Sequence, residues 1–205
     1  MYDLPTSIYI GDKEFKIRNS GDFRVVLDCF SALEDIELGE DFGILASLII
    51  FYEDFDEETV PTLDEDTIKQ LILEMYKFFN CGKEDNSDAP NNKLIDWEQD
   101  SQIIMAAVNN VAGKEIRQEE FVHWWTFVGY YMSIGESVLA TVVSIRNKIL
   151  RNETLEKWEK KFKAENEHYF HWNSKSRDER ELDQEFEMLR NAWNNGSVAG
   201  ESDGT

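Results

Sequence analysis

Apolar residues recur at three- and four-residue steps between Asp96 and Leu150, and this periodicity constrains the fold more than any other feature. Three sets follow one another: Trp97, Ile104, Val108 and Val111; Phe121, Trp124, Trp125, Val128 and Met132; and Val138, Val142, Ile145 and Ile149. Such spacing places the members of each set on one face of a helix. The stretch therefore predicts three consecutive amphipathic helices that form the core of a bundle. We expect the adjacent Trp124 and Trp125 to be mostly buried, because their apolar area is large.

Local signals predict where these three helices begin and end. Asp96 is followed three residues later by Gln99, and Ser133 is followed three residues later by Glu136. Both pairs have the spacing of a capping box, in which side chains accept hydrogen bonds from the first free amides of a helix. Gly113 fits the break after the first helix, because glycine tolerates the left-handed conformation of a helix end.

Four polar residues lie among these apolar positions and are candidate site residues: Asp96, Asp100, His123 and Arg146. One interpretation makes His123 a general base that a carboxylate orients. The other makes the four residues a structural charge network that ties the three helices together, as buried ion pairs do in many proteins. No motif places a nucleophile near them, so we favour the structural network.

The N-terminal part of the chain combines a hairpin signal with further helical periodicity. Alternating apolar residues around Gly11-Asp12 predict two short strands within Ser7–Ile17. Helices are predicted over Asp22–Leu38, Phe42–Phe51 and Asp64–Phe79. The fold class expected for the chain is mainly α, a helical bundle with a small N-terminal β-hairpin and amphipathic C-terminal helices.

The C-terminal part contains aromatic residues on strongly charged segments. Leu155, Trp158 and Phe162 alternate with lysines in a predicted amphipathic helix. Farther along, Arg177–Trp193 has one narrow apolar stripe, which consists of Leu182, Phe186, Leu189 and Trp193. Such a helix can pack on the bundle or bind a partner helix. His168 and His171 share one helix face but have no further ligands nearby, so packing or contact with a partner is favoured over a metal site.

These patterns divide the chain into four segments. Residues 1-80 form an N-terminal hairpin and acidic helical half, and residues 81-95 a linker rich in turn-forming residues. Residues 96-172 form the helical core with the His-Trp-Trp run, and residues 173-205 a C-terminal helix and a disordered tail.

The chain is strongly acidic, with 21 basic and 42 acidic residues and a net charge of -21. This charge repels nucleic acid and anionic membranes, so we expect neither as a partner. No lysine or arginine occurs between Arg24 and Lys69, whereas acidic residues recur there. The segment lacks the glycine and glutamate spacing of an EF-hand. It predicts either a solvated acidic face or a mimic of nucleic acid phosphates.

Cysteine usage and hydropathy indicate a soluble protein that folds in a reducing compartment. Cys29 and Cys81 have no metal-ligand spacing, and no signal peptide is recognisable. The longest apolar run, Leu45–Tyr52, is too short to span a bilayer. We expect no cofactor and no metal, and the sequence leaves the oligomeric state open.

Several motifs together resemble one known family. They are Leu4-Pro5-Thr6 with the hairpin, Asp96–Asp100 (DWEQD), Phe121–Phe127 (FVHWWTF) and Ile145-Arg146. This set is similar to the phage Gp-fifteen family of long-tailed phages and prophages of Gram-positive bacteria. The resemblance extends from Met1 to about Trp172, and its most specific part is the His-Trp-Trp run.

The resemblance implies a role in virion morphogenesis in the host cytoplasm, as a non-enzymatic tail assembly chaperone that keeps the tape-measure protein soluble. It supplies no catalytic residues. Five aromatic residues are candidate anchors for such a partner: Trp158, Phe162, Trp172, Phe186 and Trp193. The alternative function is an acidic DNA-mimic inhibitor of a basic host protein, and an enzyme is the weakest alternative because no nucleotide loop, metal cluster or nucleophile motif is present.

Overall fold

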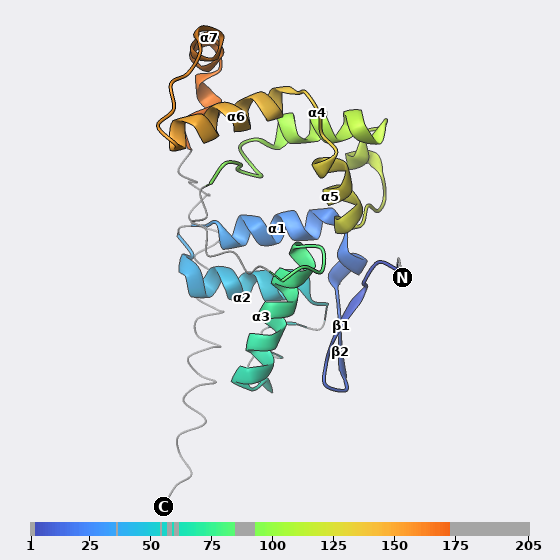
Figure 1. Ribbon diagram of the computed structural model, residues 1–205. Helices are drawn as coiled ribbons and strands as arrows, with labels where there is room; N and C mark the ends of the chain where they lie inside the picture. The colour runs from blue at the N-terminus through green and yellow to red at the C-terminus, as the bar shows by residue number, and fades with distance from the viewer. Residues whose placement is uncertain are drawn as a thin grey trace, which may run out of the picture.

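The computed structural model describes residues 3–35, 37–53, 55–56, 59, 62–84 and 93–172. α-Helices dominate it, and one two-stranded hairpin lies near the N-terminus, which confirms the predicted fold class. Figure 1 shows α1 and α2 side by side, with α3 and the hairpin at one end of the molecule and α7 at the other. The predicted C-terminal helix and the anchors Phe186 and Trp193 lie outside the described residues.

The hairpin forms where alternation predicted it. β1 (Ser7–Ile10) pairs with β2 (Lys13–Lys16) in antiparallel register, with Ile8 opposite Phe15. The turn contains Gly11 at φ 60°, a conformation that glycine adopts without strain. Ile8 and Phe15 are buried, and therefore one face of the hairpin packs on the core.

After the short helix η1 (Arg18–Gly21), three α-helices follow in the described residues of the N-terminal half, and side-chain caps fix two of their starts. α1 (Phe23–Leu33) begins after Asp22, whose carboxylate accepts the Arg24 amide, and α3 (Glu65–Phe79) begins after Asp64, which accepts the Thr67 amide. α2 (Gly39–Phe51) lies between them. α1 ends earlier than predicted, and α2 begins earlier, at Gly39.

The second half contains the three predicted helices with shifted boundaries. They are α4 (Ser101–Ala112), α5 (Trp124–Met132) and α6 (Val138–Leu150), with the short helix η3 (Ile116–Gln118) between α4 and α5. Gly113 ends α4 at φ 70°, as predicted.

Both predicted capping boxes in this half are wrong. Asp96 accepts the amides of Glu98 and Gln99 in a turn that precedes α4, whereas the residue at the α4 N-cap is Asp100. Ser133 lies at the end of α5, and Ser137 caps α6 by accepting the Ala140 amide. In each case the N-cap position is taken by a second acidic or hydroxyl residue four positions later in the chain.

The apolar sets are buried in their central members and exposed at their ends. Ile104, Val108, Val142 and Ile145 are fully buried, and Trp124 is buried whereas Trp125 is half-buried. Five predicted core residues are exposed: Val111, Phe121, Met132, Val138 and Ile149. They occupy the first or last turn of a helix or, for Phe121, the coil before α5, where no neighbouring element covers them.

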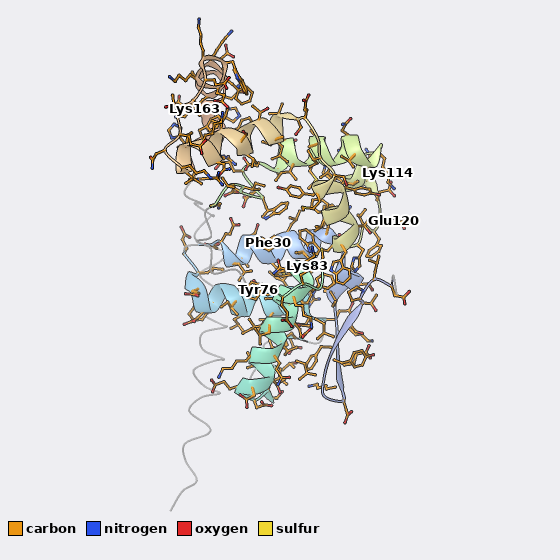
Figure 2. All side chains as sticks on the ribbon, in the orientation of Figure 1. Phe30, Tyr76, Lys83, Lys114, Glu120 and Lys163 are labelled. Atoms are coloured by element: carbon orange, nitrogen blue, oxygen red, sulfur yellow. The ribbon has the colours of Figure 1, made fainter. Side chains whose placement is uncertain are left out.

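An aromatic cluster makes the core continuous across both halves. The ring of Phe30 on α1, labelled in Figure 2, lies 5.1 Å from Phe79, 5.8 Å from Trp97 and 5.7 Å from Trp124. The Trp124 indole N–H also donates to the Phe79 carbonyl. Because rings at such distances pack favourably, the N-terminal and C-terminal halves share one core.

The chain continues into α7 (Lys157–Glu165) and the short helix η4 (Glu167–Tyr169). Glu156 and Glu159 form a capping box at the start of α7, and Glu159 also accepts from Lys148 of α6 at 2.6 Å. The predicted amphipathic helix is therefore present and is attached to α6. No helix in the described part of the chain is long and apolar enough to cross a membrane.

Candidate partner-binding site

A buried ion pair between Asp100 and Arg146 lies at the centre of the second half. The Arg146 guanidinium donates to both Asp100 carboxylate oxygens, at 2.5 and 2.9 Å, which is the bidentate geometry that arginine favours. Asp100 also accepts the backbone N–H of Asp96 at 3.0 Å. The pair joins the start of α4 to the middle of α6, and both side chains are almost completely buried.

Arg146 uses its remaining donors to hold two other segments. Its Nη1 donates to the Leu94 carbonyl at 2.9 Å, and its Nε donates to the Tyr169 carbonyl at 2.9 Å. The ring of Trp172 lies 4.3 Å from the guanidinium, a cation–π distance. Arg146 therefore ties α4, α6, the segment before α4 and the segment after α7 together.

Asp96 belongs to the edge of this cluster. Lys93 donates to Asp96 at 2.8 Å and to Glu34, at the end of α1, at 2.7 Å. Burial favours a raised pKa for Asp96, but the hydrogen bonds from Lys93 and the Gln99 amide outweigh it and hold the pKa below its ordinary value. The structure thus brings Asp96, Asp100 and Arg146 together, as the network hypothesis required.

His123 does not belong to that network, which corrects the hypothesis. It lies at the N-cap of α5, where Nδ1 accepts the Trp125 amide and Nε2 donates to the Pro5 carbonyl at 3.1 Å. Burial holds the pKa of His123 below its ordinary value. Since His123 precedes α5, the helix phase that placed it near Asp100 did not apply. Both ring nitrogens are hydrogen-bonded to backbone groups, so neither is free to act as the general base that the sequence suggested.

Asp22, next to His123, forms a second joint that sequence reasoning missed. The two residues pair as an isolated β-bridge, and the Asp22 carboxylate accepts the Val122 amide at 2.9 Å. Arg24 donates to both carboxylate oxygens of Asp22 and to the Glu119 carbonyl at 2.8 Å. These bonds connect the start of α1 to the segment before α5, about one hundred residues away in the chain.

The described candidate anchors differ in how open they are. Phe162 is half-buried and its ring lies 6.5 Å from Phe170. Trp172 contacts the Arg146 guanidinium and is still 45% exposed. Trp158 on α7 is 54% exposed and presents its ring to solvent. His171 contacts Glu167, and no group of three or more potential metal ligands occurs within the described residues.

A groove lies between α4 and the start of α6 in the described part of the chain. Its volume is about 230 Å³. The residues that line it are mostly small or apolar: Ile103, Ala106, Ala107, Asn110, Val111, Ile134, Gly135, Glu136, Ser137 and Val138. The adjacent alanines of α4 and the glycine before α6 were the available sequence signal, because small residues leave space between helices.

The fold and the two arginine–aspartate pairs define a class of mainly helical protein with one shared aromatic core and several exposed apolar residues on its surface. The model of the family described as Bacteriophage Gp15 protein matches residues 1–170, and the chain belongs to that family, a family of phage proteins. The resemblance seen in the sequence is thereby confirmed. Neither the search of curated proteins nor the search of solved structures found a match.

Proposed function

We propose that this phage protein is a non-enzymatic tail assembly chaperone that binds the tape-measure protein and keeps it soluble during tail morphogenesis. Membership of the Gp15 family supports the phage context. The observation that carries the finer proposal is the exposed apolar surface beside the groove. Val111 and Val138, which line the groove, are 36% and 50% exposed, and Met132, two residues before the lining residue Ile134, is 76% exposed. Exposed apolar patches of this kind mark binding surfaces.

The dimensions of the groove favour a helical protein partner. A volume of about 230 Å³ is below the roughly 300 to 1,000 Å³ of typical small-molecule sites. It accommodates one or two apolar side chains of a helix laid across α4 and α6. A tape-measure protein is long, helical and partly apolar, and such side chains are the ones it must shield before assembly.

The charge of the chain suits the same role. With a net charge of -21, the protein contributes strong mutual repulsion to any complex it forms. Repulsion of this kind keeps complexes dispersed and limits aggregation of a sticky partner. The apolar groove provides the contact, and the acidic body provides the solubility.

Co-expression with the tape-measure protein from the same genome tests the proposal. We expect the partner to stay soluble, to co-purify, and to remain bound at about 0.5 M salt, where the Debye length is only about 4 Å. Val138→Asp should reduce co-purification at least tenfold. Leu73→Asp is the matched control, because Leu73 is 67% exposed on α3 and lies outside the groove.

Two results would contradict the proposal. The first is an intact, folded protein that leaves its tape-measure partner insoluble and unbound at every salt concentration. The second is a complex that dissociates at 0.5 M salt and is unaffected by Val138→Asp. That result would favour the acidic mimic, whose contacts would involve the acidic residues between Asp54 and Asp66.

A further inference from the structure

The outer face of α7 is basic in an otherwise acidic protein. α7 contains four lysines and two glutamates, whereas the whole chain has a net charge of -21. Lys157, Lys160 and Lys161 are exposed on α7, which projects from the rest of the molecule in Figure 1. Within the described residues Lys157 and Lys160 have no ion pair, and Lys161 is 3.7 Å from Glu165. The face is therefore available to an acidic ligand.

Packing fixes this face outward and leaves an aromatic ring beside it. Glu159, on the inner face of α7, is buried and paired with Lys148 of α6. Trp158 lies three residues before Lys161, on a neighbouring part of the helix surface, and its indole N–H donates to Glu156 at 2.8 Å. The indole nitrogen thus has a hydrogen-bond partner, whereas the side chain is 54% exposed. A ligand that covers this face therefore has to carry acidic groups for the lysines and apolar groups for the Trp158 ring.

The chain itself carries a segment of this chemistry immediately after the described residues. Residues 178–189 contain six acidic residues and one basic residue. Leu182, Phe186 and Leu189 share one helical face, and Glu181 and Glu185 flank it. The described chain ends at Trp172, close to α7, because the ring of Phe170 contacts that of Phe162.

We propose that residues 178–189 dock on α7 of the same chain as an antiparallel helix. Leu182, Phe186 and Leu189 then cover Trp158, and the flanking carboxylates pair with Lys157 and Lys161. Residues 173–177 can span about 17 Å when extended, and α7 is about 14 Å long, so the connection is long enough to turn back.

The geometry favours the chain's own segment over that of a second copy. A short flexible linker gives an effective concentration in the millimolar range. Another copy at micromolar concentration competes poorly with it. Trp158 is thereby assigned to an intramolecular contact, while the groove at Val138 stays open for the tape-measure protein.

Hydrogen exchange of the full-length protein tests this proposal without any partner, so its outcome is independent of the proposed chaperone function. At about 0.05 M salt we expect the amides of residues 178–189 to exchange at least tenfold more slowly than amides of an unstructured chain. Lys157→Glu combined with Lys161→Glu should remove that protection. Lys13→Glu combined with Lys69→Glu is the control, because it makes the same charge change on exposed residues far from α7.

A charge exchange separates direct pairing from a general charge effect. Adding Glu181→Lys and Glu185→Lys to the double α7 variant should restore the protection. Three results would overturn the proposal: unprotected amides at low salt, protection that the α7 variant leaves unchanged, or protection that appears only when light scattering shows a doubled mass. The last would assign the contact to a second copy.

Discussion

Two arginine–aspartate pairs join distant segments of this protein, and they differ chiefly in exposure. Both aspartates lie at the N-cap of a helix, Asp22 before α1 and Asp100 before α4. Both arginines also donate to backbone carbonyls of remote segments. The side chains of Arg146 and Asp100 are 5% and 0% exposed, whereas those of Arg24 and Asp22 are 38% and 7% exposed. We call the Arg146–Asp100 pair the dry joint and the Arg24–Asp22 pair the wet joint, because water reaches only the second.

This difference predicts how much each pair matters. In the dry joint, removal of one partner leaves a charge that water cannot reach, and the loss is large. In the wet joint, water replaces much of what the arginine provides, and the loss is small. The aspartate of the wet joint is an intermediate case, because it also accepts backbone amides.

The largest effect is expected for Arg146→Met. This substitution leaves the buried Asp100 carboxylate without its bidentate partner and the Tyr169 and Leu94 carbonyls without a donor. We expect the free energy of unfolding to fall by about 3 to 5 kcal/mol in urea titrations. Arg146→Lys should recover only part of the loss, because an ammonium cannot form the fork. A loss below about 1 kcal/mol would contradict the claim that Arg146 neutralises a carboxylate that water cannot reach.

A smaller effect is expected for Asp22→Ala. The variant loses the cap of α1 and leaves the buried Val122 amide unsatisfied, which together cost about 2 to 3 kcal/mol. The same urea titration measures it. If Asp22→Ala were as destabilising as Arg146→Met, exposure would not be what separates the two joints.

Periodicity predicted the helices of both regions, but the joints could not be predicted from it. Asp100 and Arg146 were identified because charged residues stood among apolar positions of predicted helices. His123 was misplaced because its side chain belongs to a cap, where helix phase does not apply. Its contact with Pro5 and the contact of Arg146 with Tyr169 link residues whose separation no local pattern encodes. Asp22 was missed for the same reason.

A pH effect is expected next, and it comes from the buried His123, which is bridged to Asp22 of the wet joint. Burial holds the pKa of His123 below its ordinary value in the folded state. As the pH falls below about 6.5, the unfolded chain binds the proton first, so the folded state loses stability. The pKa of Asp96 is held below its ordinary value by its hydrogen bonds, so Asp96 responds only at lower pH. Between pH 7 and 5, urea midpoints should therefore fall in the wild type more steeply than in His123→Asn. Parallel curves would contradict this assignment.

The smallest effect is expected for Arg24→Met, and it completes the comparison. Arg24 donates to Asp22 and to the Glu119 carbonyl, yet 38% of its side chain is exposed. Exposed ion pairs contribute about 0 to 1 kcal/mol, and salt screens them. The variant should lose at most about 1 kcal/mol, and the loss should shrink further at 0.5 M salt. Asp22 keeps its bonds to the Val122 and Arg24 amides, since neither needs the Arg24 side chain. The Arg146→Met loss should change little with salt, because its joint is dry. A salt-independent loss of several kcal/mol in Arg24→Met would show that the guanidinium acts as a buried charge, and the distinction between the two joints would fail.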